Sequence, residues 1–398
     1  MLEAPKTKAA KKVDFDKKSV GELLVSNLPY ISAIDENTIM LRDGALMGSF
    51  AVEGVNADTI DSRFTAELST AFGRFIAHQK GNVAFYVHRM SLETKPTIKP
   101  VEGHPFNVEL DRRWLDYLQN IGLRERLTMV TIILPPPQKI SKLLHFFDKT
   151  DSFNREEIAA RALRLDQMIK TCMATTSAAK PRRLRISDGE WLSLLRTMVD
   201  GTSAKLVPGT KFVPLSDLLV NANIHFVGNK FIVHGPCSNK KRYGTIISIK
   251  DYPSETFPGI FDRLNLPYDM VISQSFTPID NVTAQGKISR VRKQMTAAED
   301  AAVSLLHQLE EAADDVASGR VVIGMHHCSI ELFCDSEKEL EEAMTYVTRA
   351  MQDAGSAIVR ESFSARSVYF AQHPGNFTYR TRPAMISSQN FAELCALH

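Results

Sequence analysis

Hydrophobic spacing predicts a regular order of helices and strands in the first part of the chain. Apolar residues three and four positions apart predict a helix over 57–78, and the run NVAFYVHRM at 82–90 predicts a strand. A helix around 111–121 and a strand over 127–134 follow, while Asp43-Gly44 predicts a hairpin turn between two earlier strands. The order hairpin, helix, strand, helix, strand is typical of split β-α-β units.

The second part repeats this order. The predicted strands are 229–235, 242–252, 269–276, 321–334, 356–362 and 367–372, and the predicted helices are a short one near 256–264, a long one over 281–318 and a third over 336–353. Two earlier helices, 154–174 and 188–199, precede a polar connector. We therefore expect an α+β protein with two antiparallel-sheet domains, residues 19–204 and 205–368.

The long helix carries the most regular pattern. Its apolar positions alternate between spacings of three and four, as in a heptad seam: Ile288, Val291, Met295, Ala298, Ala302, Leu305, Leu309, Ala312 and Val316. Its cations lie near the start and its acids near the end, against the helix dipole, at about 0.3–1 kcal/mol per unscreened mismatch. This arrangement favours a charged partner, so Arg290 and Arg292 are candidate subunit-docking residues.

Net charge and hydrophobicity predict where the protein is located and add one segment, a basic arm at the amino terminus. The formal net charge is +2, which gives no global field for nucleic acid or an anionic bilayer. No apolar run approaches the roughly 20 residues that span a bilayer, and no secretory signal opens the chain, so we expect a cytoplasmic protein. Residues 1–18 predict a disordered basic arm. Its candidate contacts with an anionic membrane surface or an acidic partner are Lys6, Lys8, Lys11 and Lys12.

Motifs for catalysis, cofactors and metals are missing. The sequence contains no G-x-x-x-x-G-K-[ST] loop, no G-x-S-x-G elbow and no H-E-x-x-H helix. Five widely spaced cysteines indicate reduced thiols. Cys328 and Cys334, on one strand face with His326, lie roughly 20 Å apart and cannot share a zinc ion. We therefore expect no catalytic, cofactor-binding or metal-binding residue in this chain.

Nucleic-acid binding stays open as an alternative function. Two local clusters could contact phosphates: Lys180, Arg182, Arg183 and Arg185, and Lys240, Lys241 and Arg242. Neither is interleaved with aromatic residues that could stack on bases. The alternative is therefore a module that handles a transferred strand, and salt-dependent binding of single-stranded DNA would identify it.

The end of the chain carries the most distinctive stretch, YFAQHPGNFTYRTRPAMISSQN at 369–390. Together with a short motif near the start it resembles the CagE/TrbE/VirB family, the large ATPase of type IV secretion and conjugation machines, in the region just before its motor domain. The residues that carry the resemblance are Leu28, Pro29, Tyr30, Pro374, Gly375, Asn376, Arg380, Arg382, Ser387, Ser388, Asn390 and Phe391.

The resemblance implies a function that this chain does not perform alone. It implies that the full-length protein continues past His398 into a RecA-like motor that binds ATP and Mg, and that residues 369–398 are the linker to this missing domain, anchored by Phe391 and Leu394. It also implies a peripheral position on the cytoplasmic face of the bacterial inner membrane. The implied partners are the inner-membrane subunits of the secretion channel, other secretion ATPases and further copies of the protein, and the implied cargo is DNA or protein.

Overall fold

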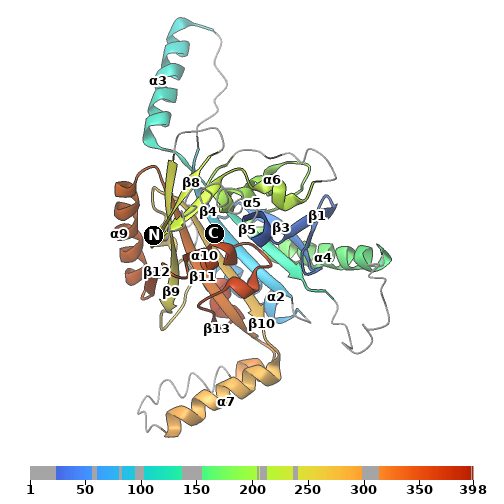
Figure 1. Cartoon of the computed structure of the whole chain (residues 1–398). Coiled ribbons are helices and arrows are strands. Elements are labelled where there is room, and N and C mark those ends of the chain that lie inside the picture. The colour runs from blue at the N-terminus through green and yellow to red at the C-terminus, as the bar shows by residue number, and fades with distance from the viewer. Residues whose placement is uncertain are drawn as a thin grey trace, which may run out of the picture.

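The computed structural model describes most of the chain from residue 24 onward (Figure 1). The described residues are 24–55, 61–79, 83–94, 103–136, 155–203, 206, 213–235, 241–297, 313–395 and 397. The predicted basic arm, with Lys6, Lys8, Lys11 and Lys12, lies outside them, and so does the side chain of Arg292.

The described strands form a single 13-stranded antiparallel sheet in the order β1-β2-β3-β5-β4-β10-β11-β9-β8-β7, with β6 beside β3, β12 beside β9 and β13 beside β11. Their bounds are β1 (Tyr30–Asp35), β2 (Thr38–Leu41), β3 (Leu46–Val52), β4 (Ala84–Glu93), β5 (Arg124–Leu134), β6 (Pro181–Arg183), β7 (Asn223–Val227), β8 (Lys230–His234), β9 (Lys241–Asp251), β10 (Asp269–Pro278), β11 (Ile323–Cys334), β12 (Ala357–Arg360) and β13 (Ala384–Ser387). The central strands β4 and β10 are buried over most of their length on both faces of the sheet.

Local capping signals position the helices. The Asp61 carboxylate accepts from the Arg63 N–H at the start of α2, and the Ser336 hydroxyl accepts from the Glu339 N–H at the start of α9. The helices are α2 (Ser62–Ala77), α3 (Pro105–Ile121), α4 (Arg155–Thr175), α5 (Glu190–Asp200), α6 (Leu215–Leu219), α7 (Asn281–Ala297), α9 (Glu337–Asp353), α10 (Ala365–Ala371) and α11 (Ser388–Leu394). Short 3₁₀ turns are η3 (Ser177–Ala179), η4 (Asp262–Leu264) and η5 (Phe377–Tyr379).

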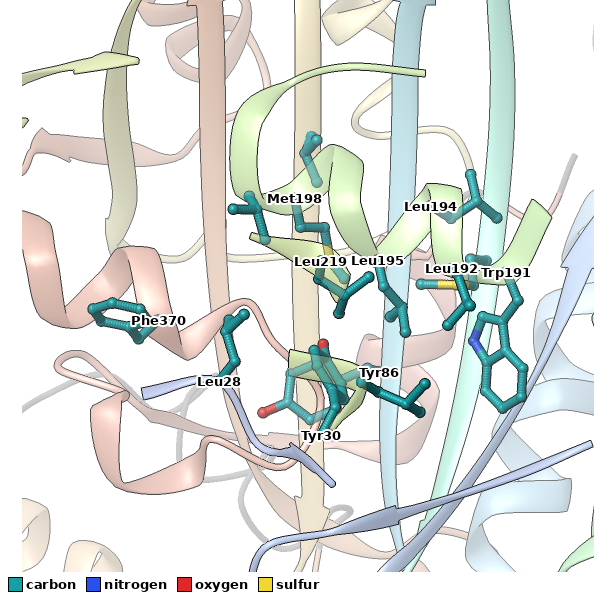
Figure 2. Packing of buried hydrophobic residues seen from close by; sticks show 14 of the residues in the cluster. Leu28, Tyr30, Tyr86, Trp191, Leu192, Leu194, Leu195, Met198, Leu219 and Phe370 are labelled. Carbon is teal, nitrogen blue, oxygen red and sulfur yellow. The ribbon is translucent and has the colours of Figure 1, made fainter. Parts of the chain in front are cut away.

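One face of the sheet is covered by α5, α6 and α10 (Figure 2). Trp191 and Leu195 of α5 and Leu219 of α6 pack with Tyr86 of β4, and Phe370 of α10 belongs to the same buried cluster. All five side chains are at most 1% exposed, so this layer forms a closed core.

The opposite face is covered in two sections. Helices α2, α4 and α11 cover one section, where Phe72 and Phe391 pack with Phe276 of β10. Helix α9 covers the other section, where Val347 packs in a cluster with Ile330 of β11. The three layers confirm the predicted α+β class.

The two predicted domains share this sheet. Strand β4 from the first and β10 from the second pair without interruption from Ser91 opposite Met270 to Phe85 opposite Phe276. The Asp269 carboxylate also joins Arg124 on β5 and Arg242 on β9, with N–O distances of 2.7 and 2.6 Å. The boundary near residue 205 stays a prediction, and backbone pairing crosses it.

Two predicted elements are wrong in type or extent. The run SVYFAQ, predicted as a strand, lies largely in α10, because its apolar side chains are buried on a helix that packs between α5, β9 and η5. Short apolar runs do not distinguish buried helices from strands by periodicity alone. The helix predicted near 256–264 is reduced to the single turn η4.

The long predicted helix is described only at its two ends, as α7 and a helical segment at 313–317. Ala284 and Ile288 form a small buried cluster with Val316 and Ile323. The middle of the heptad pattern lies outside the described residues. In Figure 1, α7 projects from the end of the body opposite α3.

The continuous sheet makes a thermal unfolding prediction. Both tryptophans, Trp114 and Trp191, lie in the first predicted domain, so tryptophan fluorescence reports that part and far-ultraviolet circular dichroism reports the whole chain. Because β4–β10 pairing couples the two parts, we expect both probes to give one coincident transition. Two separated transitions would instead support independent domains divided near residue 205.

Candidate functional site at the junction of the two motifs

The motif near the start of the chain forms the entry to β1. Leu28 and Tyr30 are fully buried, and Pro29 lies between them. The Ser216 hydroxyl of α6 donates to the Tyr30 carbonyl over 2.5 Å, and the Arg42 Nε donates to the Leu28 carbonyl over 2.7 Å. These bonds hold the entry strand beneath α6.

The Pro374-Gly375-Asn376 turn packs directly on this entry strand. The Asn376 side-chain amide donates to the Asn27 carbonyl over 2.9 Å, and the Tyr30 hydroxyl lies 3.3 Å from the His373 Nδ1. Gly375 has φ +106°, and a Cβ there would lie 2.6 Å from the Leu41 Cδ1. The two motifs of the sequence therefore form one contact, which we call the junction; within it, Tyr30 and His373 lie 343 positions apart in the sequence.

The two arginines after this turn fasten the chain to the sheet. The Arg380 guanidinium donates to the Met325 carbonyl and the Thr277 hydroxyl, both over 3.2 Å, and lies 5.0 Å from the centroid of the Phe377 ring. Burial lowers the pKa of Arg380 from its usual value. Arg382 pairs with the buried Glu361 carboxylate over 2.8 Å. Both arginines hold the segment in place.

The Ser-Ser-Gln-Asn cluster begins α11. Ser387 and Asn390 form a reciprocal capping box, and the Asn390 amide also donates to the Thr256 hydroxyl over 2.9 Å. Ser388 is fully buried, and its carbonyl would lie 3.3 Å from a Cβ at Gly73, so α11 approaches α2 where α2 has no side chain.

The two predicted anchors, Phe391 and Leu394, are buried in the body of the protein. The Phe391 ring stacks on Phe276 with centroids 4.9 Å apart, and the Gln274 amide donates to the Leu394 carbonyl over 2.9 Å. Strand β13 pairs with β11 just before this helix. The segment predicted as a linker is therefore packed into both layers of the core over residues 369–395.

Beneath the junction, the covered face of the central sheet is unusually polar. Pairing places His88, Ser273, Ser329 and Ser248 in one row across β4, β10, β11 and β9. The adjacent rows add Ser275 and His327 on one side and Glu331 on the other. Sequence reasoning missed this face, and the signal available was the alternation of serine and histidine with apolar residues in VISQSF and GMHHCSIEL.

Gln372 connects this polar face to α5. Its backbone carbonyl accepts from the His88 Nε2–H over 2.8 Å, and its side-chain amide donates to the Met198 carbonyl over 3.0 Å. Tyr369, one turn earlier, donates its hydroxyl to the Val199 carbonyl over 2.7 Å. The segment is thus bonded to the sheet below and to α5 above.

Burial disfavours the charged forms of the ionisable groups on this face. It lowers the pKa of His88 and of His327 to about 4 and that of His373 to about 3. It raises the pKa of Glu331 well above its ordinary value, against a smaller opposing effect of the Gln372 side chain. Neither Glu331 oxygen has a hydrogen bond of standard geometry within the described residues.

On the other face, His326 belongs to a separate chain of hydrogen bonds. Its Nδ1 lies 2.7 Å from the Tyr252 hydroxyl and its Nε2 lies 3.2 Å from the Gln274 Oε1. Cys328 and Cys334 share this face with it, and both thiols are buried within apolar surroundings. Burial among apolar side chains raises the pKa of Cys328 to about 12.

Three arginines of the predicted nucleic-acid clusters have partners within the protein, whereas Lys180, Arg185 and Lys241 are exposed. Arg182 pairs with Glu190, and the Arg183 guanidinium donates to the Asn37 and Ser49 carbonyls. Arg242 pairs with Asp269. Lys240 lies outside the described residues, while Arg290, predicted to dock a subunit, is exposed on α7. The Arg182–Arg183 and Arg242 sites are therefore largely neutralised.

Comparison with known proteins places the chain in a family. The profile of the CagE, TrbE, VirB family, a component of the type IV transporter system, matches residues 176–382, which is more than half of the chain. The chain belongs to this family. The profile of the N-terminal domain of the type IV secretion system ATPase VirB4/TrbE matches residues 37–142, in the other half.

Individual family members align along almost the whole chain. The type IV secretion system protein virB4 of Bartonella quintana is 29% identical over 387 residues, which cover 93% of this chain and 48% of the relative. Protein virB4 of Agrobacterium tumefaciens strain 15955 is 26% identical over 376 residues, covering 92% and 47%. The chain thus spans about half the length of the curated relatives it matches. In the described residues, no helix combines the length and apolar character needed to cross a bilayer.

The junction predicts an unequal effect of two glycine substitutions. Gly375→Ala must place a Cβ against Leu41 in a left-handed conformation, so we expect it to lower the free energy of unfolding by about 3 kcal/mol. Gly228→Ala, also at positive φ but with open space around it, should cost only about 1 kcal/mol. Chemical denaturation of both variants measures the difference, and equal losses would contradict a crowded junction.

The buried Glu331 side chain predicts that a neutral replacement increases the free energy of unfolding in a pH-dependent way. Burial raises the pKa of Glu331 in the folded protein, so the contribution of this side chain to the free energy of unfolding is complete below about pH 4.5. This contribution is lost as the pH rises, by up to about 1.4 kcal/mol per pH unit. We therefore expect Glu331→Gln to match the wild type at pH 4.5 and to be increasingly more stable than the wild type as the pH rises to 7.

Denaturation of both proteins across this pH range tests the prediction. The buried histidines lose stability below pH 6.5 in both proteins, so their effect cancels in the difference. Glu342→Gln, on the exposed side of α9, is the matched control. A difference that does not grow with pH would show that Glu331 is ionised in the folded protein.

Proposed function

We propose that this chain is the assembly and docking region of a type IV secretion ATPase and that it has no catalytic activity alone. In the full-length protein, ATP and Mg bind to a motor domain that follows residues 369–398, and hydrolysis powers transfer of DNA or protein and assembly of the machine. Membership of the family and the alignment with about half of each virB4 relative support this proposal.

The observation that carries the proposal is the junction. The Tyr30 hydroxyl lies against His373, the Asn376 amide bonds the Asn27 carbonyl, and Gly375 packs against Leu41. Arg380 ties the same segment to β10 and β11. A motor attached through a segment that is bonded to both layers of the core moves this region as a rigid body. The segment is therefore a mechanical coupling between the motor and the docking surfaces.

The proposed location is the cytoplasmic face of the bacterial inner membrane, by peripheral contact. The proposed partners are the inner-membrane subunits of the secretion channel, other secretion ATPases and further copies of the same protein. The projecting helices α3 and α7 support this role, because they extend from opposite ends of the body (Figure 1). The nucleic-acid alternative has less support, because Arg182 and Arg242 are paired with carboxylates.

Arg380→Gln in the full-length protein tests mechanical coupling. Loss of the guanidinium weakens the bonds to Met325 and Thr277 but touches no nucleotide site. We expect ATP hydrolysis to stay within about twofold of wild type while substrate transfer falls by at least about tenfold. Arg366→Gln, an exposed position on α10, should leave both unchanged. Normal transfer by the folded Arg380 variant, or ATP hydrolysis by this chain alone, would contradict the proposal.

Docking is tested by cell fractionation of this chain. We expect it to sediment with inner membranes that contain the channel subunits and to stay in the supernatant with membranes that lack them. Replacing Lys6, Lys8, Lys11 and Lys12 by glutamate distinguishes the basic arm from the folded body as the docking element. Equal sedimentation with both membranes would indicate a lipid contact, and salt-sensitive binding of single-stranded DNA would favour the nucleic-acid alternative.

A further inference from the structure

Helix α3 carries a stripe of large apolar side chains that no other described element covers. Five side chains form the stripe and are 50–67% exposed: Phe106, Leu110, Trp114, Tyr117 and Ile121. No residue of the helix is buried. In Figure 1, α3 stands away from the body at one end. Exposed apolar patches of this kind mark binding surfaces.

Local interactions define the helix without tertiary contacts. The His104 Nδ1 accepts from the Phe106 N–H at 3.2 Å, Pro105 occupies the first turn, and Gly122 ends the helix with φ +69°. On the flank of the stripe, Arg112 pairs with Glu109 at 2.8 Å and with Asp116 at 2.9 Å. The stripe is therefore presented on a preformed helix.

The spacing of the stripe identifies the kind of surface it fits. Leu110, Trp114, Tyr117 and Ile121 are separated by four, three and four residues, and at 100° per residue the stripe spans only about 80° of the helix. The 4-3-4 spacing of these exposed side chains is that of a coiled-coil seam, which packs against another helix. The Trp114 and Tyr117 rings already stack within the helix, with centroids 5.5 Å apart.

The charges of α3 argue against a bilayer as the partner. Helices that lie on anionic membranes are rich in lysine and arginine on the polar face. Here three acids, Glu109, Asp111 and Asp116, outnumber Arg112 and Arg113. The ion pairs of both arginines close within the helix itself. The polar face therefore has no attraction for anionic lipid.

We propose that the partner of α3 is α3 of a second copy of this chain, packed antiparallel about a two-fold axis. The 4-3-4 spacing reads the same in both directions, as a two-fold interface requires. Antiparallel pairing forms two kinds of layer, Trp114 against the partner's Tyr117 and Leu110 against the partner's Ile121. This inference rests on the proposed self-association and assigns it a surface.

The position of α3 suits this pairing. Because the helix projects from one end of the body, antiparallel packing places the two bodies at opposite ends of the helix pair, where they do not collide. The stripe buries on the order of 500 Å² per copy, at the lower limit for a specific interface. The contact is therefore weak in isolation and gains strength where the machine brings several copies together.

Cysteine cross-linking tests the geometry. In a Cys237→Ser background, the Leu110→Cys chain and the Ile121→Cys chain should each stay uncross-linked alone and form a disulfide dimer when mixed and oxidised, because residue 110 faces residue 121 of the other copy. Cys172, Cys328, Cys334 and Cys395 are buried and do not compete. A dimer formed by the Leu110→Cys chain alone would indicate parallel packing and overturn the proposal, as would no dimer in the mixture.

Sedimentation tests the energetics on the unmodified chain. We expect concentration-dependent dimers, with Trp114→Glu weakening the dimer at least about 30-fold. Val108→Glu, exposed on the opposite side of α3, is the matched control and should leave the dimer unchanged. Equal weakening by both variants, or a monomeric wild type that binds phosphatidylcholine vesicles through Trp114, would overturn the proposal.

The two proposals fail in distinguishable ways. Self-association is measured on this chain without a motor, membrane or substrate, so an absent α3 contact leaves the coupling and docking results intact. Conversely, normal transfer by the Arg380 variant leaves the cross-linking result intact.

Discussion

The contact between the Pro374-Gly375-Asn376 turn and the strand entry at Asn27–Tyr30 is the constraint on which the rest of the structure depends. It requires a glycine where Leu41 leaves no room for a Cβ, and an amide that bonds the Asn27 carbonyl. Because the turn is held there, α10 before it lies against α5, and β13 and α11 after it reach the opposite face. A single segment thereby joins the two core layers.

The sheet face that this segment covers carries polar side chains, although it is buried. Burying an ionisable group without a partner is costly, and burial shifts the pKa of Glu331 and of the histidines in the direction that favours their neutral forms. Gln372 satisfies part of the surface through its carbonyl bond to His88.

The two projecting helices, α3 and α7, differ from the body of the protein. Helices α3 and α7 project from opposite ends of a body whose central strands are paired throughout. Helix α3 is stabilised by its caps and local ion pairs, such as Arg112 with Glu109, whereas α7 also buries Ala284 and Ile288 in a small cluster with Val316 and Ile323. This division between a rigid body and projecting helices suits a family that works within the type IV transporter system.

The sequence by itself determined the elements whose side-chain pattern is strong and local. Helices α2, α4, α5 and α9 and strands β4, β5, β10 and β11 lie where hydrophobic periodicity predicts them, and the family follows from motifs that need no fold. Only the tertiary structure decided that β4 pairs with β10, that SVYFAQ lies in a helix, and that the segment after residue 369 fills the core. These outcomes depend on contacts between residues hundreds of positions apart, such as Tyr30 with His373, and periodicity within a window of ten or twenty residues carries no information about them.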